Sequence, residues 1–162
     1  MKEQALKDLR EKIDALDEQI QALIATRANL AAEVAKVKKE TNTQSVFYRP
    51  EREAQVLSRV IERNKSLLKD KDVGHIFREI MSACLALEQP LKIAFLGPEG
   101  TFTQEAALRH FGHAVSTLDC GNIDEIFHQV ETDNAHYGVV PIENSSNGVI
   151  GATLDLLYSH DL

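Results

Sequence analysis

Long apolar runs are missing from this 162-residue sequence, so we expect no membrane-spanning helix, which would need about 20 such residues. The first twelve residues are charged throughout, which argues against a secretory signal. Only two cysteines occur, Cys84 and Cys120, and their spacing fits neither a zinc site nor a disulfide framework. A cytoplasmic protein is therefore expected. The net charge of −7 disfavours nucleic acid as a general partner.

Charge and glycine divide the chain into two parts. Residues 1–90 carry 16 of the 18 lysines and arginines against 15 acidic residues, whereas residues 91–162 carry 10 acidic residues and two basic ones. Seven of the eight glycines also follow Pro90. Such a change after a proline marks a domain boundary. We predict an all-helical domain over residues 1–90 and the first part of an α/β domain over 91–162, which the chain leaves incomplete.

One long helix is predicted over about residues 5–39, because apolar residues recur there at alternating steps of three and four. We call this heptad pattern the seam; its apolar members are Leu6, Leu9, Ile13, Leu16, Ile20, Leu23, Leu30, Val34 and Val37. Such a helix would be about 50 Å long, too long to bury the seam within one small domain. The seam is therefore expected to pack on a second copy of the chain.

One seam position holds a cation, Arg27, which must be paired with an anion if it is buried. Lys38 lies eleven residues later, close to three helical turns, and so shares a face with Arg27. The two could hold two carboxylates of one small molecule, and Arg10 of a partner chain could reach the same ligand. Alternatively, Arg27 extends to the surface or pairs with a nearby glutamate.

Two shorter helices are predicted next. Pro50 suits the first turn of one, and Asp72 is a candidate N-cap for another that ends near Gln89. An apolar stripe on the last helix continues through Cys84 to Glu88, and an apolar surround favours a neutral, proton-donating carboxyl group. Equally, Glu88 could lie in water at a frayed helix end.

The segment after Pro90 begins with a predicted strand over 93–96. A glycine-containing turn follows, and Thr101 or Thr103 can cap a helix that runs through Phe111. Free amides at the start of that helix could bind a carboxylate. The turn is not G-x-G-x-x-G, so nucleotide binding is not favoured.

A second strand is predicted over 137–140, followed by Asn144 and Ser145 and then by a helix over about 148–158. On this pattern alone, Asn144 and Ser145 are simple helix caps, as such residues usually are.

Three motifs in the first segment resemble the all-helical chorismate mutase domain: LREKID at residues 9–14, the spacing of Arg27 and Lys38, and RPERE at 49–53. The resemblance covers residues 1–90 and implies a long helix plus two shorter helices in an intertwined homodimer. It implies an isomerase that converts chorismate to prephenate by a [3,3] rearrangement, with no cofactor and no metal.

Matched positions imply the roles of individual residues. Arg10 reaches the partner's site, Arg27 and Lys38 hold the two carboxylates, Lys38 and Glu88 donate to the ether oxygen, and Glu53 binds the ring hydroxyl. The implied catalytic set is Arg10, Arg27, Lys38 and Glu88. The implied substrate-binding set is Arg10, Arg27, Lys38, Arg49, Arg52, Glu53, Cys84 and Glu88.

Three positions depart from the family pattern. Arg49 stands where an aspartate is common, and Cys84 stands where a serine often contacts a carboxylate, although a thiol is a weaker donor. Glu88 stands where some members have glutamine, so the site should depend on pH.

KIAFLGPEGTFT at 92–103 and GVVPIENSSNG at 138–148 resemble the first half of prephenate dehydratase. The two domains in this order resemble the bifunctional chorismate mutase–prephenate dehydratase family of phenylalanine biosynthesis. The resemblance implies a periplasmic-binding-protein-like fold with Thr101, Asn144 and Ser145 at a prephenate pocket. The Thr-Arg-Phe motif with the family's catalytic threonine does not occur in these 162 residues, so we expect no dehydratase activity from this chain.

Two non-catalytic alternatives stay open. A dimeric coiled-coil scaffold could carry a small ligand-binding α/β module, or a regulatory module could bind prephenate or phenylalanine without turnover. A scaffold should be stabilised by Arg27→Leu, whereas an enzyme should be inactivated by it.

Overall fold

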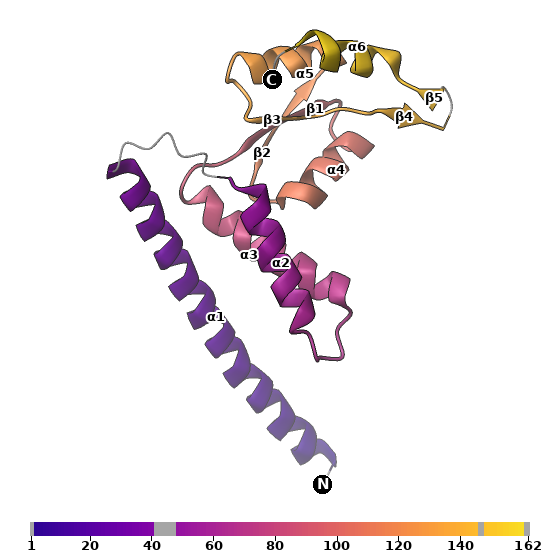
Figure 1. The fold of residues 1–162 in the computed structure, drawn as a ribbon. Helices are drawn as coiled ribbons and strands as arrows, with labels where there is room; N and C mark the ends of the chain where they lie inside the picture. The colour runs from indigo at the N-terminus through magenta and orange to yellow at the C-terminus, as the bar shows by residue number, and fades with distance from the viewer. Residues whose placement is uncertain (1, 41–47, 146–147, 161–162) are drawn as a thin grey trace. The chain divides into compact units, whose positions relative to one another are not determined.

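Figure 1 shows the computed structural model of the chain, which describes residues 2–40, 48–145 and 148–160. The chain divides into two compact units, Met1–Phe47 and Tyr48–Leu162. Within the described ranges, none of the helices combines the length and apolar character needed to cross a membrane.

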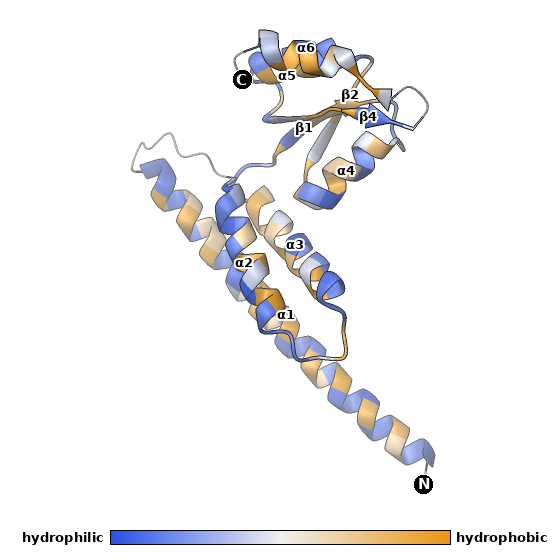
Figure 2. Cartoon of the chain, turned by 45° about the vertical axis from the view of Figure 1, so that its right-hand side comes forward, coloured by the Kyte–Doolittle hydropathy of each residue, from blue (hydrophilic) through white to orange (hydrophobic). Residues whose placement is uncertain are grey.

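The first unit contains one helix, α1 (Lys2–Glu40), which confirms the predicted long helix and extends it by a few residues. The helix is continuous because residues 2–40 include neither glycine nor proline, the two residues that most destabilise a helix interior. Figure 2 shows apolar residues recurring along α1 between hydrophilic ones. The seam residues remain 49% to 69% exposed in this single chain, so their apolar surface is available to a partner.

Two helices open the second unit, α2 (Pro50–Glu62) and α3 (Asp70–Ala86), and they pack against each other. Pro50 occupies the first turn of α2, as predicted. The predicted N-cap Asp72 is wrong, because α3 begins two residues earlier, at Asp70. The N-cap residue is Lys69, whose carbonyl accepts from the Val73 amide at 3.1 Å, and Asn64 in the preceding loop donates to the Asp70 carboxylate at 2.7 Å. Asp72 lies instead in the first turn, where its negative charge interacts favourably with the positive end of the helix dipole.

A three-stranded parallel sheet follows, made of β1 (Lys92–Leu96), β2 (Ser116–Cys120) and β3 (Tyr137–Val139) in the order β2-β1-β3. The strands predicted over 93–96 and 137–140 are confirmed as β1 and β3. The intervening β2 was not predicted, since its sequence STLDC is mostly polar and most of its side chains are exposed at the sheet edge.

Helices cover both sides of this sheet. In Figure 1, α4 (Phe102–Phe111) lies on one side, and α5 (Ile123–Glu131) and α6 (Gly151–Ser159) lie on the other. The predicted helix through Phe111 is α4. The helix predicted from residue 148 begins three residues later, because β4 (Glu143–Asn144) and β5 (Gly148–Val149) pair as an antiparallel hairpin.

Two apolar cores lie on opposite faces of β1. One contains Ala94, Cys120, Ile126 and Ala135. The other contains Tyr48, Leu91, Ile93, Ala107 and Phe111, with the partly buried Leu85 of α3 packed against it. The second core therefore joins residues from both sides of residue 90. The domain division at that residue, 1–90 and 91–162, stays a prediction from composition.

Candidate active site

The three cations predicted on the long helix all lie on α1. Arg27 and Lys38 are partly buried, and three turns separate them by about 16 Å along the helix axis. Arg10 is exposed and lies about 26 Å from Arg27 along the axis. Arg10 and Arg27 of one helix are therefore too far apart to bind one small ligand together.

The start of α2 carries Arg52 and Glu53, and Arg49 directly precedes the helix. Arg49 is the N-cap residue in extended conformation, and its carbonyl accepts from the Glu53 amide at 3.0 Å. Both arginine side chains are exposed, whereas the Glu53 side chain is only 17% exposed. Glu53 is therefore the member of this group that the fold holds in place.

Two side chains surround the Glu53 carboxylate. Arg78 of α3 donates from Nε to Glu53 Oε1 at 3.3 Å. Burial, and then the negative charge of Glu53, raise the pKa of Tyr48 to about 12, so its phenol stays protonated at physiological pH. The Tyr48 hydroxyl lies 3.4 Å from Nε2 of His110 on α4.

Cys84 lies in the last turn of α3, and Glu88 follows the end of that helix. Cys84 is buried and carries a free thiol. Glu88 lies two residues beyond the helix, in a turn where its amide donates to the Leu85 carbonyl at 2.9 Å. One carboxylate oxygen of Glu88 is buried, which does not fit a frayed end lying fully in water.

Thr101 occupies the N-cap position of α4, but its side chain does not cap the helix. Its hydroxyl and that of Thr103 both donate to the Leu96 carbonyl, at 3.0 and 2.7 Å. The two hydroxyls thus tie the start of α4 to the end of β1, and the predicted capping bond is wrong. Thr101 also lines a cleft of about 380 Å³ together with Gln104 and Arg109.

Asn144 lies in β4 and Ser145 in the following turn, and both are exposed. The alternative in which they cap the last helix is wrong, since Ile150 is the N-cap of α6. The segments after β1 and β3 leave the sheet at the same edge, because these are adjacent parallel strands. Thr101 and Asn144 therefore follow the same edge of the sheet.

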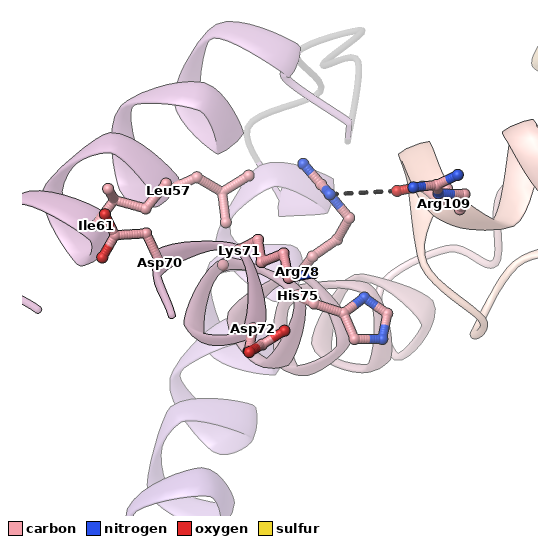
Figure 3. A pocket seen from close by; sticks show the side chains of 9 residues that line it. Leu57, Ile61, Asp70, Lys71, Asp72, His75, Arg78 and Arg109 are labelled. Carbon is pink, nitrogen blue, oxygen red and sulfur yellow. Dashed lines mark hydrogen bonds between the residues drawn. The ribbon is translucent and has the colours of Figure 1, made fainter. Parts of the chain in front are cut away.

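A larger cleft of about 500 Å³ lies among α2, α3 and α4 (Figure 3). Its charged or polar lining comes mainly from α3, and Arg109 contributes from α4. The lining residues are Leu57, Ile61, Asp70, Lys71, Asp72, Gly74, His75, Arg78 and Arg109. The sequence does not predict this cleft, because its lining comes from three separate helices whose packing is not visible in the residue pattern.

Two known protein families match this chain, one after the other along the sequence. Residues 9–89 match the chorismate mutase type II family, and residues 93–162 match the prephenate dehydratase family. The chain belongs to the chorismate mutase type II family.

Its relatives join both domains. The bifunctional chorismate mutase/prephenate dehydratase of Pseudomonas aeruginosa is 53% identical over 160 residues, covering 97% of this chain and 44% of the relative. That of Escherichia coli is 38% identical over 182 aligned positions, covering 99% and 45%. A solved prephenate dehydratase structure from Streptococcus mutans is 38% identical, with a TM-score of 0.41, and covers 44% of this chain and 37% of that one. The chain thus spans less than half the length of these curated relatives.

All eight residues of the expected mutase site lie within the chorismate mutase type II match, and Thr101, Asn144 and Ser145 lie within the prephenate dehydratase match. These matches confirm the predicted order of the two families along the chain. The residues predicted from the sequence do not include Arg78, the cation beside Glu53. A signal was present: Arg78 and Glu79 are the only acidic or basic residues, histidine aside, between Val73 and Leu87.

Proposed function

We propose that this chain catalyses the chorismate mutase reaction, the rearrangement of chorismate to prephenate. One carbon–oxygen bond breaks as one carbon–carbon bond forms, so every atom stays in the substrate. The observation that carries the proposal is the pair Arg27 and Lys38, three turns apart on one face of α1 and within the residues that match the family. Their spacing suits a ligand with two carboxylates.

The proposed catalysis is positional and electrostatic. Arg27 and Lys38 hold the substrate carboxylates, supported by Arg52, and so favour the reactive conformer. Lys38 and Glu88 donate to the ether oxygen, on which negative charge develops in the transition state. Glu53 binds the ring hydroxyl. Nothing in this scheme requires a general base, which accounts for a site of cations and proton donors.

A homodimer completes the proposed site. The exposed seam of α1 offers a second copy an apolar stripe, interrupted at Arg27, as in a coiled coil. Arg10 lies too far along α1 from Arg27 to serve the same ligand, and in an antiparallel pair the partner's Arg10 can reach it. A dimer alone does not distinguish the enzyme from the two non-catalytic alternatives. The proposed substrate contacts of Arg27 and Arg10 do.

We also propose that Thr101, Asn144 and Ser145 contribute to prephenate recognition at the edge of the sheet. The periplasmic-binding-protein-like fold and the cytoplasmic location stay predictions. The 162-residue polypeptide is expected to lack dehydratase activity, because the Thr-Arg-Phe motif does not occur in it. Phenylpyruvate formation from prephenate above the acid-catalysed background would contradict this.

The proposed function is tested by the rate at which the purified chain consumes chorismate and forms prephenate. Lys38→Met should lower kcat by about a hundredfold, the usual cost of removing a donor to a developing oxyanion. Lys36→Met, at an exposed position of the same helix, should leave the rate unchanged. No conversion by the unmodified chain would refute the mutase proposal.

Glu88 gives the proposed site a dependence on pH. A carboxyl group donates to the ether oxygen only when protonated, and an ionised Glu88 would repel the developing negative charge. The value of kcat/KM should therefore fall as pH rises, and Glu88→Gln should flatten the fall because an amide donates throughout. Profiles from about pH 5 to 9 decide this, and an unchanged falling limb in the variant would rule out the role of Glu88.

A further inference from the structure

The guanidinium group of Arg78 connects two segments that match different families. Its Nε donates to Glu53 Oε1 at 3.3 Å, and its Nη1 donates to the backbone carbonyl of Arg109 at 3.2 Å. Figure 3 shows the second of these bonds, between α3 and α4. The Arg78 and Glu53 side chains are 30% and 17% exposed, so the ion pair is better shielded from water than a surface pair.

The carbonyl of Arg109 is one that α4 itself leaves without a partner. In a longer helix the amide of His113 would donate to it, but that amide donates to Glu79 Oε2 at 3.1 Å instead. Arg78 and Glu79, adjacent on α3, thus satisfy the carbonyl and the amide at the end of α4. The positive charge of Arg78 also suits the negative end of the α4 dipole.

The end of α4 is held against α3 by a close approach of the two backbones. A Cβ added to Gly112 would lie 2.4 Å from the Ser82 Cβ, so only glycine fits there. Ser82 Oγ in turn accepts from the Ala114 amide at 3.3 Å. The carbonyl that receives Arg78 is therefore fixed relative to α3, and it restricts where the guanidinium can lie.

We propose that Arg78 is a positioning residue of the mutase site, which holds the Glu53 carboxylate in place from an anchor at the end of α4. The inference rests on the proposed function, in which Glu53 binds the ring hydroxyl of chorismate. Its consequence is that a helix of the segment matching prephenate dehydratase contributes to substrate binding by the mutase. The effect should fall mainly on KM, because the ring hydroxyl is bound alike in the substrate and in the transition state.

The test is a double-mutant cycle on mutase activity in the full chain. Arg78→Met should raise KM for chorismate about tenfold with kcat changed less than about twofold. In the Glu53→Ala background the same substitution should change kcat/KM less than about twofold, since Arg78 would have nothing left to position. Arg59→Met, an exposed arginine of α2, is the matched control and should change neither constant.

Arg78→Lys is the second variant, which keeps the charge and much of the packing if Arg78→Met does not fold. One ammonium group cannot reproduce the two-partner geometry of a guanidinium, so KM should lie between those of the unmodified and the Met proteins. An unchanged KM in both variants, or a full additive effect in the Glu53→Ala background, would overturn the inference. An inactive unmodified chain would overturn the mutase proposal and this inference together.

Discussion

The helix α1 and the unit that begins at Tyr48 are built on different principles. In the second unit Ile93, Ala94 and Phe95 are fully buried, and helices cover both faces of the sheet. In α1 the seam residues are about half exposed or more, and the helix has no core of its own. The second unit thus has its own source of stability, whereas α1 depends on apolar contacts outside itself.

This difference bears on how the proposed site is assembled. Arg10, Arg27 and Lys38 belong to the helix without a core, while Glu53 and Glu88 belong to the unit that has one. Cations of the proposed site thus lie on the element that we expect to pack on a second copy of the chain. We expect the mutase activity to be more sensitive to the state of association than the folding of the second unit is.

The largest expected effect comes from Arg27→Leu. If α1 serves only as a scaffold, a leucine in the seam stabilises the dimer and there is no activity to lose. If α1 carries the site, kcat/KM falls by about 10²–10³. We expect the loss of activity together with an unchanged or raised melting temperature, since an apolar seam packs better than one with a buried cation. The measurements are chorismate turnover and thermal unfolding. An active Arg27→Leu protein would favour the scaffold.

The next effect is complementation between two inactive variants. Arg10→Ala and Arg27→Ala each damage every site of their own homodimers. In a heterodimer one site receives both defects and the other receives neither, so random exchange should restore about a quarter of the unmodified activity. Turnover is measured after subunit exchange has been verified. No recovery in the exchanged mixture would contradict shared sites.

The parts of the fold that the sequence predicted are those with a regular pattern. The steps of three and four predicted α1 nearly to its ends, and the apolar run at 93–96 predicted β1. The strand β2 has no such pattern, because an edge strand needs little apolar surface. The sequence predicts a helix from residue 148, where the structure has β5, since strands of two residues are too short to show alternation.

The candidate site divides in the same way. Arg27 and Lys38 could be predicted because one helix fixes their spacing. Arg78 stands out as a charged residue in a mostly uncharged stretch, but its role could not be predicted, because its partners are Glu53, 25 residues away, and a backbone carbonyl of Arg109, which leaves no trace in residue type. Side chains that act on distant backbone groups are found only once the helices are packed.

A moderate effect on stability is expected from Gly112→Ala in the second unit. Gly112 and Gly100 both have positive φ, at 82° and 84°, but a Cβ would lie 2.4 Å from Ser82 Cβ at Gly112 and meet nothing within 4 Å at Gly100. Gly100→Ala should cost about 1 kcal/mol of conformational strain. Gly112→Ala should cost about 3 kcal/mol, since overpacking adds to the strain. If the two substitutions lower the free energy of unfolding in urea equally, the contact between α3 and the end of α4 adjusts to accept the added Cβ.

The smallest expected effect is the acid dependence of the same contact. Burial opposes the ionisation of Glu79, but hydrogen bonds from His113 outweigh burial, and the pKa of Glu79 is lowered. Glu79 therefore adds stability above its unfolded pKa of about 4.3, and this share is lost as pH falls through the lower folded value. The share should be below about 1 kcal/mol, because the His113 side chain is 61% exposed and screened by water.

Glu79→Gln should lower the free energy of unfolding slightly at neutral pH and make its fall in acid shallower. Glu99→Gln, at an exposed loop position, is the matched control and should keep the acid limb of the unmodified chain. Unfolding free energies from about pH 3 to 7 compare the three proteins. If Glu79→Gln and the control have the same acid limb, the contact between α3 and the end of α4 does not depend on the charge of Glu79. The position of the end of α4 against α3 would then depend on the close approach at Gly112 and on the hydrogen bonds of Arg78.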